Sequence, residues 1–179
     1  MRIPEVRNGQ QIVGLTLPVP EPWASELRQA RIGFGDPCGR TVPCHITIVP
    51  PTAVETTSLS HIQRQVAEVA GATSRFAVHL RGTGTFQPVS PVVFVRVVEG
   101  IPECEHLETA CRRGPLAQTL RFAYQPHVTI AHEVPQAALD QAFEQLAGFE
   151  ALFEASCVVL HTLGQAGTWR QIGHFAFDS

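Results

Sequence analysis

The chain has 179 residues, 44% of them hydrophobic and 16% charged, which is the composition of a folded globular protein rather than a disordered or fibrous one. This length predicts one domain over residues 1–179, built from two lobes that share a core. The formal net charge is −3, and all 13 Lys and Arg residues are arginines. Such a balance excludes a protein that coats long stretches of nucleic acid, whereas a nucleotide or one RNA end needs only one or two cations.

The longest apolar runs, such as Val92–Val95, are too short to span a membrane, and the N-terminus lacks an apolar signal segment. We therefore expect a cytoplasmic protein with no membrane contact, and a monomer. Five scattered cysteines contain no C-x-x-C pair, which argues against a disulfide framework or a zinc ribbon. His127 and His132, beside Glu133, match no zinc-binding spacing, so no metal and no cofactor are expected.

In chain order, amphipathic spacing and end signals predict four helices, over about Pro22–Arg31, Ser60–Ala70, Glu103–Arg113 and Pro135–Ala147. The segments between them predict strands at Gln11–Pro18, Cys44–Val49, Arg75–Arg81, Val92–Val98, His127–His132, Leu152–His161 and Thr168–Phe177. Turns are predicted at Gly82-Thr83-Gly84 and at residues 164–167. Because strands often follow one another directly, much of the sheet should be antiparallel.

The order of these elements repeats along the chain. Each half has a helix, a short strand with the sequence His-x-Thr-x, a second helix and a strand pair. The two strands read Pro43-Cys44-His45-Ile46-Thr47-Ile48 and Pro126-His127-Val128-Thr129-Ile130, and a proline-containing turn is expected after each. We infer an internal duplication. It predicts an α+β, bilobal fold, with pseudo-two-fold duplicated lobes, mainly antiparallel sheets flanking a central cleft, and helices on the outside.

The spacing within each motif has a chemical meaning. Side chains at i and i+2 of a strand share a face, so His45 projects with Thr47, and His127 with Thr129. If the lobes are related by a pseudo-two-fold axis, two imidazoles and two hydroxyls converge on one cleft. One neutral histidine then removes a proton from the attacking oxygen, one protonated histidine supplies a proton to the leaving oxygen, and the hydroxyls bind phosphate oxygens. The plainer alternative is a pair of half-buried structural histidines.

The doubled motif resembles the 2H phosphoesterase superfamily, specifically the bacterial group of 2′-5′ RNA ligase-like or RNA 2′,3′-cyclic phosphodiesterase proteins. The resemblance covers nearly the whole chain, from about Ile12 to about Phe177. It implies a bilobal α+β fold and metal-independent opening of 2′,3′-cyclic phosphate ends of RNA or nucleotides. It would make His45 the acid and His127 the base, with Thr47 and Thr129 binding phosphate, although a pseudo-symmetric site can run in either direction.

The chain departs from the family pattern after the second motif. Many relatives have an arginine there that touches phosphate, whereas this chain has Ala131-His132-Glu133. His132 is a candidate substitute for that cation, but strand alternation places it on the face opposite His127 unless a turn redirects it. Other candidate anion contacts are Arg81, Arg121 and Arg170.

Several aromatic residues are candidates for substrate contact. Tyr124 precedes the second motif, and Phe86 resembles a phenylalanine that the family places in a similar Gly-then-Phe loop. Either ring would stack on a nucleobase or pack in the core. Trp169 and Phe175 are expected in the core. Cys44 points to the strand face opposite His45, which favours a buried apolar residue over a nucleophile.

Three functional hypotheses follow. The first is an enzyme that hydrolyses a cyclic phosphodiester by acid/base catalysis at the two histidines. The second is a binding module that grips a nucleotide or RNA end without turning it over. The third is RNA ligation, the reverse of such chemistry, which equilibrium disfavours in dilute solution.

Overall fold

The computed structural model describes residues 3–164 and 167–178. The strands are β1 (Gln10–Pro18), β2 (His45–Glu55), β3 (Phe76–Thr85), β4 (Val92–Glu99), β5 (His127–His132), β6 (Glu150–Ala155), β7 (Cys157–Leu163) and β8 (Trp169–Ala176). The helices are α1 (Trp23–Gly33), α2 (Leu59–Gly71), α3 (Ile101–Cys111) and α4 (Gln136–Gln145), with short 3-10 turns η1 (Thr56–Ser58) and η2 (Gly114–Leu116).

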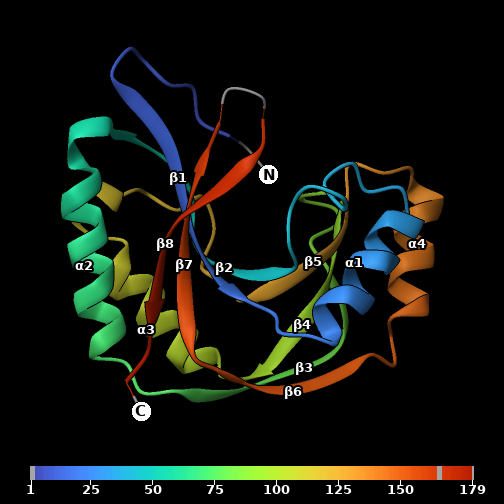
Figure 1. Ribbon diagram of the computed structural model, residues 1–179. Coiled ribbons are helices and arrows are strands. Elements are labelled where there is room, and N and C mark those ends of the chain that lie inside the picture. Colours follow the sequence, from blue (N-terminus) through green and yellow to red (C-terminus); the bar gives the residue numbers. More distant parts are fainter. Residues whose placement is uncertain (1–2, 165–166, 179) are drawn as a thin grey trace.

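The eight strands form one curled sheet in the order β6-β3-β4-β5-β2-β1-β7-β8 (Figure 1), and neighbouring strands are antiparallel. This order is symmetric about the boundary between β5 and β2, which are the two strands that carry the His-x-Thr motifs. At that boundary Ile46 pairs with Val128. The two predicted lobes are therefore the two four-stranded halves of a single sheet, and the predicted fold class is confirmed.

The helices are exchanged between the halves. Helix α1 precedes β2 in the chain but packs against β5, whereas α3 precedes β5 and packs against β2. Helix α2 covers β7 and β8, and α4 covers β3, β4 and β5 (Figure 1). Each half of the sheet is thus covered by one helix from each half of the chain.

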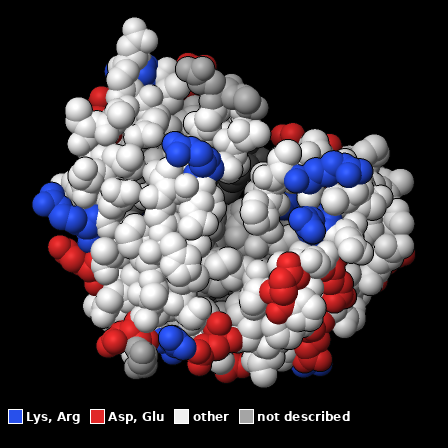
Figure 2. All heavy atoms as spheres, viewed as in Figure 1, with Lys and Arg blue, Asp and Glu red and all other residues white. Residues whose placement is uncertain are grey.

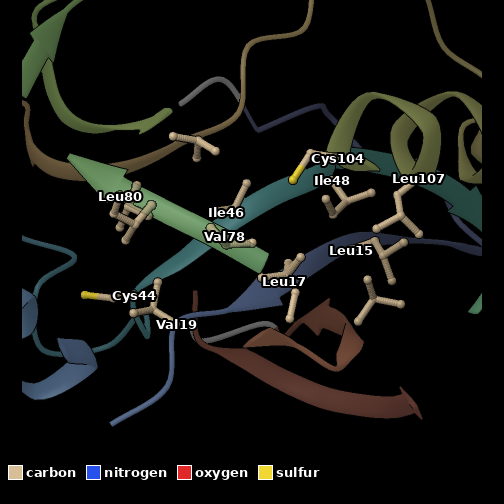
Figure 3. Close-up of a cluster of buried hydrophobic side chains, with 14 of the residues drawn as sticks. Leu15, Leu17, Val19, Cys44, Ile46, Ile48, Val78, Leu80, Cys104 and Leu107 are labelled. Carbon is tan, nitrogen blue, oxygen red and sulfur yellow. The ribbon is translucent and has the colours of Figure 1, made fainter. Parts of the chain in front are cut away.

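The motif strands owe their position to their apolar residues. Ile46 and Ile48 on β2, and Val128 and Ile130 on β5, are completely buried, whereas the histidines and threonines between them are partly exposed. In Figure 3, Ile48 points toward Cys104 and Leu107 of α3. Burying each of these branched side chains stabilises the fold by about 1.5–3 kcal/mol. This packing holds the backbone so that the polar face of each strand is presented to the cleft.

The four predicted helices and most strand positions are confirmed within a few residues. Three boundaries were wrong. The Gly82-Thr83-Gly84 turn is an irregularity inside β3, where the register with β4 shifts between Leu80 and Thr83. No proline-containing turn follows the first motif in the described chain, since β2 continues through Pro50-Pro51 to Glu55, with the register against β1 shifting there. Prolines are tolerated in strands at such irregularities.

The third wrong boundary concerns the segment Leu152–His161, which is two strands separated at Ser156. The first of them, β6, pairs with β3, and the second, β7, pairs with β1, so they belong to opposite halves of the sheet. The predicted turn at 164–167 includes residues 165–166, which lie outside the described residues; beside them the Gly164 N–H donates to the Thr168 carbonyl. In the described parts of the chain no helix is long and apolar enough to cross a membrane.

Candidate active site

The two motifs meet at the centre of the sheet. Because Ile46 pairs with Val128 in an antiparallel register, one step along the strands brings Thr47 opposite His127 and His45 opposite Thr129. In an antiparallel ladder, residues that face each other share one face of the sheet with Cβ atoms about 5 Å apart, and diagonal neighbours are about 7–8 Å apart. His45 and His127 stand in this diagonal relation. The structure therefore brings all four predicted catalytic residues to one patch of the concave face.

Both imidazoles are held by the same local hydrogen bond. Nδ1 of His45 lies 2.7 Å from the carbonyl of Pro43, and Nδ1 of His127 lies 2.8 Å from the carbonyl of Gln125. A carbonyl oxygen only accepts, so each Nδ1 carries the proton and donates it. In the neutral ring Nε2 is then an unprotonated acceptor. The backbone two residues before each histidine thus fixes its tautomer and leaves Nε2 for chemistry.

Burial makes both histidines poor bases at rest. Desolvation lowers the pKa of His45 from its ordinary 6.5 to about 4, with smaller lowering effects from the charges of Arg31, His161 and His127, against the raising effect of the Pro43 carbonyl. Desolvation likewise lowers the pKa of His127. Near neutral pH both rings are therefore uncharged in the free protein, and an anion between them would favour protonation of one of them.

The threonine hydroxyls are available to a ligand. Within the described chain neither Thr47 nor Thr129 uses its hydroxyl in a hydrogen bond, although both side chains are partly buried beside the histidines. A hydroxyl that faces a cleft in this way donates readily to a phosphate oxygen.

Two phenylalanine rings form the wall beside His127. Phe86 meets the imidazole edge-on, with ring centres 4.9 Å apart, and Phe94 lies 5.0 Å from it. The two phenyl rings also contact each other, at 4.4 Å. Phe86, which the sequence made a candidate for substrate contact, therefore contacts a motif histidine. The apolar rings exclude water from it, which accounts for the lowered pKa of His127.

Tyr124 reaches the site from the other side of the sheet boundary. Its hydroxyl donates a 2.9 Å hydrogen bond to the backbone carbonyl of Thr47, and its ring packs against the hydrophobic core. Burial raises the pKa of Tyr124, so the phenol stays protonated as a donor.

The bulge in β5 decides where His132 lies. Thr129 pairs with Phe94 but Ala131 pairs with Val93, so Ile130 is an extra residue in the ladder. A bulge of this kind reverses the alternation beyond it. His132 consequently returns to the face of His127 and Thr129, where simple alternation placed it on the opposite face. Desolvation lowers its pKa, and Glu133 lies 3.8 Å away.

The three arginines singled out from the sequence lie elsewhere. Arg81 pairs in register with Glu150 on the edge strand β6. Arg121 lies over the ring of Phe122, 5.0 Å from its centre. Arg170 is exposed and sits between two residues of β8 that line the cleft, so strand alternation points it away from the cleft.

A pocket of about 170 Å³ opens beside His45 and Thr47 on the concave side of β2, β1, β7 and β8. Most of its surface is apolar, and its far end is formed by His161, Trp169 and Gln171. Sequence reasoning missed His161 and assigned Trp169 to the core, whereas Trp169 is partly exposed in this pocket. The available signal was alternation in β7 and β8 once both strands were known to lie in the same half as β2. Phe175, by contrast, packs against the core, and Cys44 is buried, as predicted.

A second, smaller hollow adjoins this pocket. The two share the segment 42–44 as a wall, and the smaller one is also lined by Arg28 and Arg40, both exposed. Neither arginine forms an ion pair within residues 3–164 and 167–178. Glu21, the acidic residue of the hollow, accepts hydrogen bonds from the N–H and hydroxyl of Ser25. Figure 2 shows basic side chains on both sides of the hollow between the lobes, while most acidic ones gather lower in the view.

Among the described residues no three His, Cys, Asp or Glu side chains are grouped closely enough to hold a metal ion. Cys44 is buried, and desolvation raises the pKa of its thiol, which is unfavourable for a nucleophile.

A curled antiparallel sheet in two halves, each presenting a His-x-Thr strand at the centre, is the architecture expected of two-histidine phosphoesterases. The sequence comparison agrees, since residues 18–166 match the model of the 2′-5′ RNA ligase superfamily, and the chain belongs to that family. A Bacillus cytotoxicus protein whose name assigns it provisionally to the phosphoesterases is 30% identical over 130 residues, 73% of this chain and 75% of that protein. A similarly named Bacillus cereus protein is 30% identical over 136 residues, 75% of this chain and 78% of that protein.

Solved structures show the same fold. The crystal structure of E. coli LigT complexed with 3′-AMP matches with a TM-score of 0.68 at 15% identity, covering 95% of this chain and 99% of that one. The complex of LigT with NADP+ gives 0.66 at 14% identity, with coverage of 95% and 99%. A structure described as a phosphoesterase gives 0.67 at 14% identity, covering 94% and 99%. At these identities the likeness concerns the fold alone.

Proposed function

We propose that the protein is a metal-independent cyclic phosphodiesterase that hydrolyses 2′,3′-cyclic phosphate ends of RNA or nucleotides. The observation that carries the proposal is the pairing of β2 with β5, which places His45 and His127 diagonally opposite each other on one face of the sheet. In each neutral ring Nδ1 donates its proton to a backbone carbonyl, so Nε2 is left unprotonated. Membership of the 2′-5′ RNA ligase superfamily supports phosphoester chemistry, and the LigT complexes show that a protein of this fold binds nucleotides.

In the proposed reaction Nε2 of His127 accepts a proton from water as the water oxygen attacks phosphorus. The bond from phosphorus to one ribose oxygen breaks, and protonated His45 donates its proton to that leaving oxygen. The product is a phosphomonoester with a free neighbouring hydroxyl. Thr47 and Thr129 donate hydrogen bonds to the two non-bridging oxygens, whose charge grows in the transition state.

The lowered pKa of His45 fits this scheme because the substrate supplies a negative charge. In the free protein the ring is neutral, but a phosphodiester anion within hydrogen-bonding range stabilises the imidazolium and raises the pKa. His45 is assigned as the acid and His127 as the base, in line with the family resemblance, and the pseudo-symmetry of the two strands allows the opposite order.

The hollow beside the pocket supports an RNA end as substrate over a lone nucleotide. Arg28 and Arg40 lie next to the segment that leads into His45, without carboxylate partners among the described residues. A second phosphate of an oligonucleotide, adjacent to the reacting one, would be neutralised there.

The test is turnover of the four nucleoside 2′,3′-cyclic phosphates and of an oligoribonucleotide with a cyclic phosphate end, with and without a chelator. We expect His45→Gln and His127→Gln each to lower kcat by about 10²- to 10⁴-fold, while His106→Gln, an exposed histidine of α3, leaves it unchanged. Wild-type rates in both motif variants would rule out the mechanism. Tight nucleotide binding without product would instead identify a binding module, and ester formation from separated ends would identify a ligase.

A further inference from the structure

A buried ion pair lies at the end of α1, where the proposed reaction does not use it. Nε of Arg31 donates to Oδ2 of Asp36 at 3.1 Å, and a terminal nitrogen of the same guanidinium lies 3.0 Å from that oxygen. Arg31 is 5% exposed and Asp36 4%, and of the ion pairs within residues 3–164 and 167–178 this one alone has both side chains buried. The pair joins the last turn of α1 to the segment that follows it.

That segment, residues 36–44, is hydrogen-bonded step by step as far as the first motif. Oδ1 of Asp36 accepts a 2.8 Å hydrogen bond from the backbone N–H of Cys38, and the carbonyl of Cys38 accepts one of 2.9 Å from the N–H of Val42. Pro43 comes next, and its carbonyl lies 2.7 Å from Nδ1 of His45. A continuous series of bonds therefore leads from the Asp36 carboxylate to the imidazole of His45.

The segment 36–44 also lies directly against α1. A Cβ at Gly39 would be 3.1 Å from the backbone nitrogen of Ile32 and 3.2 Å from the carbonyl carbon of Arg31, so the absence of a side chain permits this close approach. Helix α1 in turn packs against β5, the strand that carries His127. The segment that leads into His45 is thus anchored to the helix that covers the strand of the second motif.

A buried ion pair suits a positioning role better than a stabilising one. Desolvation of the two charges offsets much of their attraction, so such a pair contributes little net stability. A different placement of the segment 36–44 would, however, leave a charge buried without its partner, which is strongly unfavourable. The bond to the Pro43 carbonyl decides which nitrogen of His45 carries the proton, so a fixed carbonyl also fixes the tautomer.

We propose that Arg31 and Asp36 are positioning residues for the first motif. The pair holds the segment 36–44 so that the Pro43 carbonyl keeps the proton of neutral His45 on Nδ1 and leaves Nε2 for the substrate. Neither residue lines the pocket or the adjoining hollow, so their effect passes through His45. The effect on turnover rests on the proposed function, whereas the tautomer of His45 is measured without it.

The test combines kinetics with ¹⁵N NMR of the histidine side chains, which reports the ring nitrogen that carries the proton. The signal missing in His45→Gln assigns His45. In the wild type at pH 7 we expect the form protonated on Nδ1 alone. In Asp36→Asn we expect a mixture of tautomers, and a kcat for a nucleoside 2′,3′-cyclic phosphate about 10- to 100-fold lower with KM nearly unchanged, because a misplaced catalytic ring costs rate rather than binding.

The double variant Arg31→Met with Asp36→Leu separates positioning from stability. Without an unpaired buried charge it should unfold at a higher temperature than Asp36→Asn. It should nevertheless keep the low kcat and the mixed tautomers, because the N–H of Cys38 has lost its acceptor. Glu108→Gln is the matched control, since it breaks the ion pair between a buried carboxylate of α3 and Arg112, and it should change neither kcat nor the tautomer.

A double variant with the wild-type kcat and with His45 protonated on Nδ1 alone would overturn the inference while the proposed function stands. An equal loss of kcat in Glu108→Gln would do the same. If neither Asp36 variant folds, Arg31→Lys decides, because it keeps the charge but loses the planar guanidinium, and mixed tautomers are again expected. If the wild type hydrolyses no cyclic phosphate, the proposed function fails separately, and the tautomer of His45 in these variants still decides the inference.

Discussion

The hydroxyl of Tyr124 donates a 2.9 Å hydrogen bond to the backbone carbonyl of Thr47, across the boundary between the two motif strands. Tyr124 precedes β5, and Thr47 lies on β2 opposite His127. This bond ties the segment that leads into the second motif to the middle of the first. It makes Tyr124 a positioning residue whose effect on the reaction passes through the alignment of the two strands.

For Tyr124→Phe we expect a loss of about 1 kcal/mol in the free energy of unfolding, because one hydrogen bond of a partly buried phenol is removed and the ring volume is kept. The value of kcat should fall several-fold while KM for a cyclic phosphate changes little, since the ring contacts the core. Urea unfolding and steady-state kinetics measure the two effects. A rise in KM at constant kcat and constant stability would instead indicate a direct contact with substrate.

The pH optimum of kcat/KM should lie below the ordinary pKa of histidine. The value of kcat/KM reports the free protein, in which desolvation lowers the pKa of His45 to about 4 and lowers that of His127 as well. One ring must be protonated and the other neutral, so the bell-shaped profile of kcat/KM should have its maximum below pH 6.5. The profile of kcat should lie at higher pH, because bound phosphate raises the pKa of both rings. A kcat/KM maximum at pH 7.5 or above would contradict this prediction.

The pH dependence of the free energy of unfolding should also reflect the lowered pKa of His45. Its pKa is lower in the folded protein than in the unfolded chain, so below pH 6.5 the unfolded chain binds the proton first, and the free energy of unfolding falls as pH falls from 6.5 to about 4. This shift corresponds to at most about 3 kcal/mol. We expect His45→Gln to lose less stability than the wild type over this interval in urea titrations at several pH values. Parallel pH dependence in the two proteins would contradict the assignment.

Arg28 and Arg40 should matter for long substrates only. Because they line a hollow next to the pocket, we expect Arg28→Gln with Arg40→Gln to weaken binding of a cyclic-phosphate-ended oligoribonucleotide and to flatten its salt dependence by about one unit in slope or more. Hydrolysis of a nucleoside cyclic phosphate should be unchanged. Arg64→Gln, which removes one exposed charge from α2, is the control. An equal loss on both substrates would place the arginines at the reacting phosphate instead.

The absence of a side chain at Gly84 leaves room for the ring of Phe94, which packs beside His127. A Cβ at this position would lie 2.6 Å from the ring of Phe94, which in turn contacts the imidazole of His127. We expect Gly84→Ala to displace that ring, destabilise the protein by about 1–3 kcal/mol and reduce turnover. Gly33→Ala, where a Cβ would meet nothing within 4 Å, is the matched control and should be neutral in both thermal unfolding and kinetics.

The fold was predictable because its signals are local. Helical spacing gave the four helices, and the repeated order of elements gave the two halves, each with one motif strand. Two of the three wrong boundaries have a common cause, since Gly82, Gly84, Pro50 and Pro51 ordinarily end strands but are accommodated by register shifts inside β3 and β2. Whether a glycine or proline ends a strand depends on pairing with neighbours far away in the chain, which no local pattern reports.

The residues of the site likewise fall into those that the sequence could predict and those that it could not. His45, Thr47, His127 and Thr129 could be chosen from the sequence because each pair sits two residues apart on one strand. His161, Trp169 and Gln171 could not, because their role depends on β7 and β8 joining the half of the sheet that contains β2. The position of His132 likewise depends on the bulge at Ile130, which reversed the expected alternation.

The exchange of α1 and α3 between the halves has a consequence for how the molecule could be divided. A cut in the segment between β3 and β4 would leave one fragment with β2 but without the helix that packs beneath it, and the other with β5 in the same condition. Neither fragment would bury its apolar face alone, and each would carry only one of the two motif histidines. Complementation of the two pieces should therefore restore structure and activity together, which makes the chain a natural candidate for a split reporter.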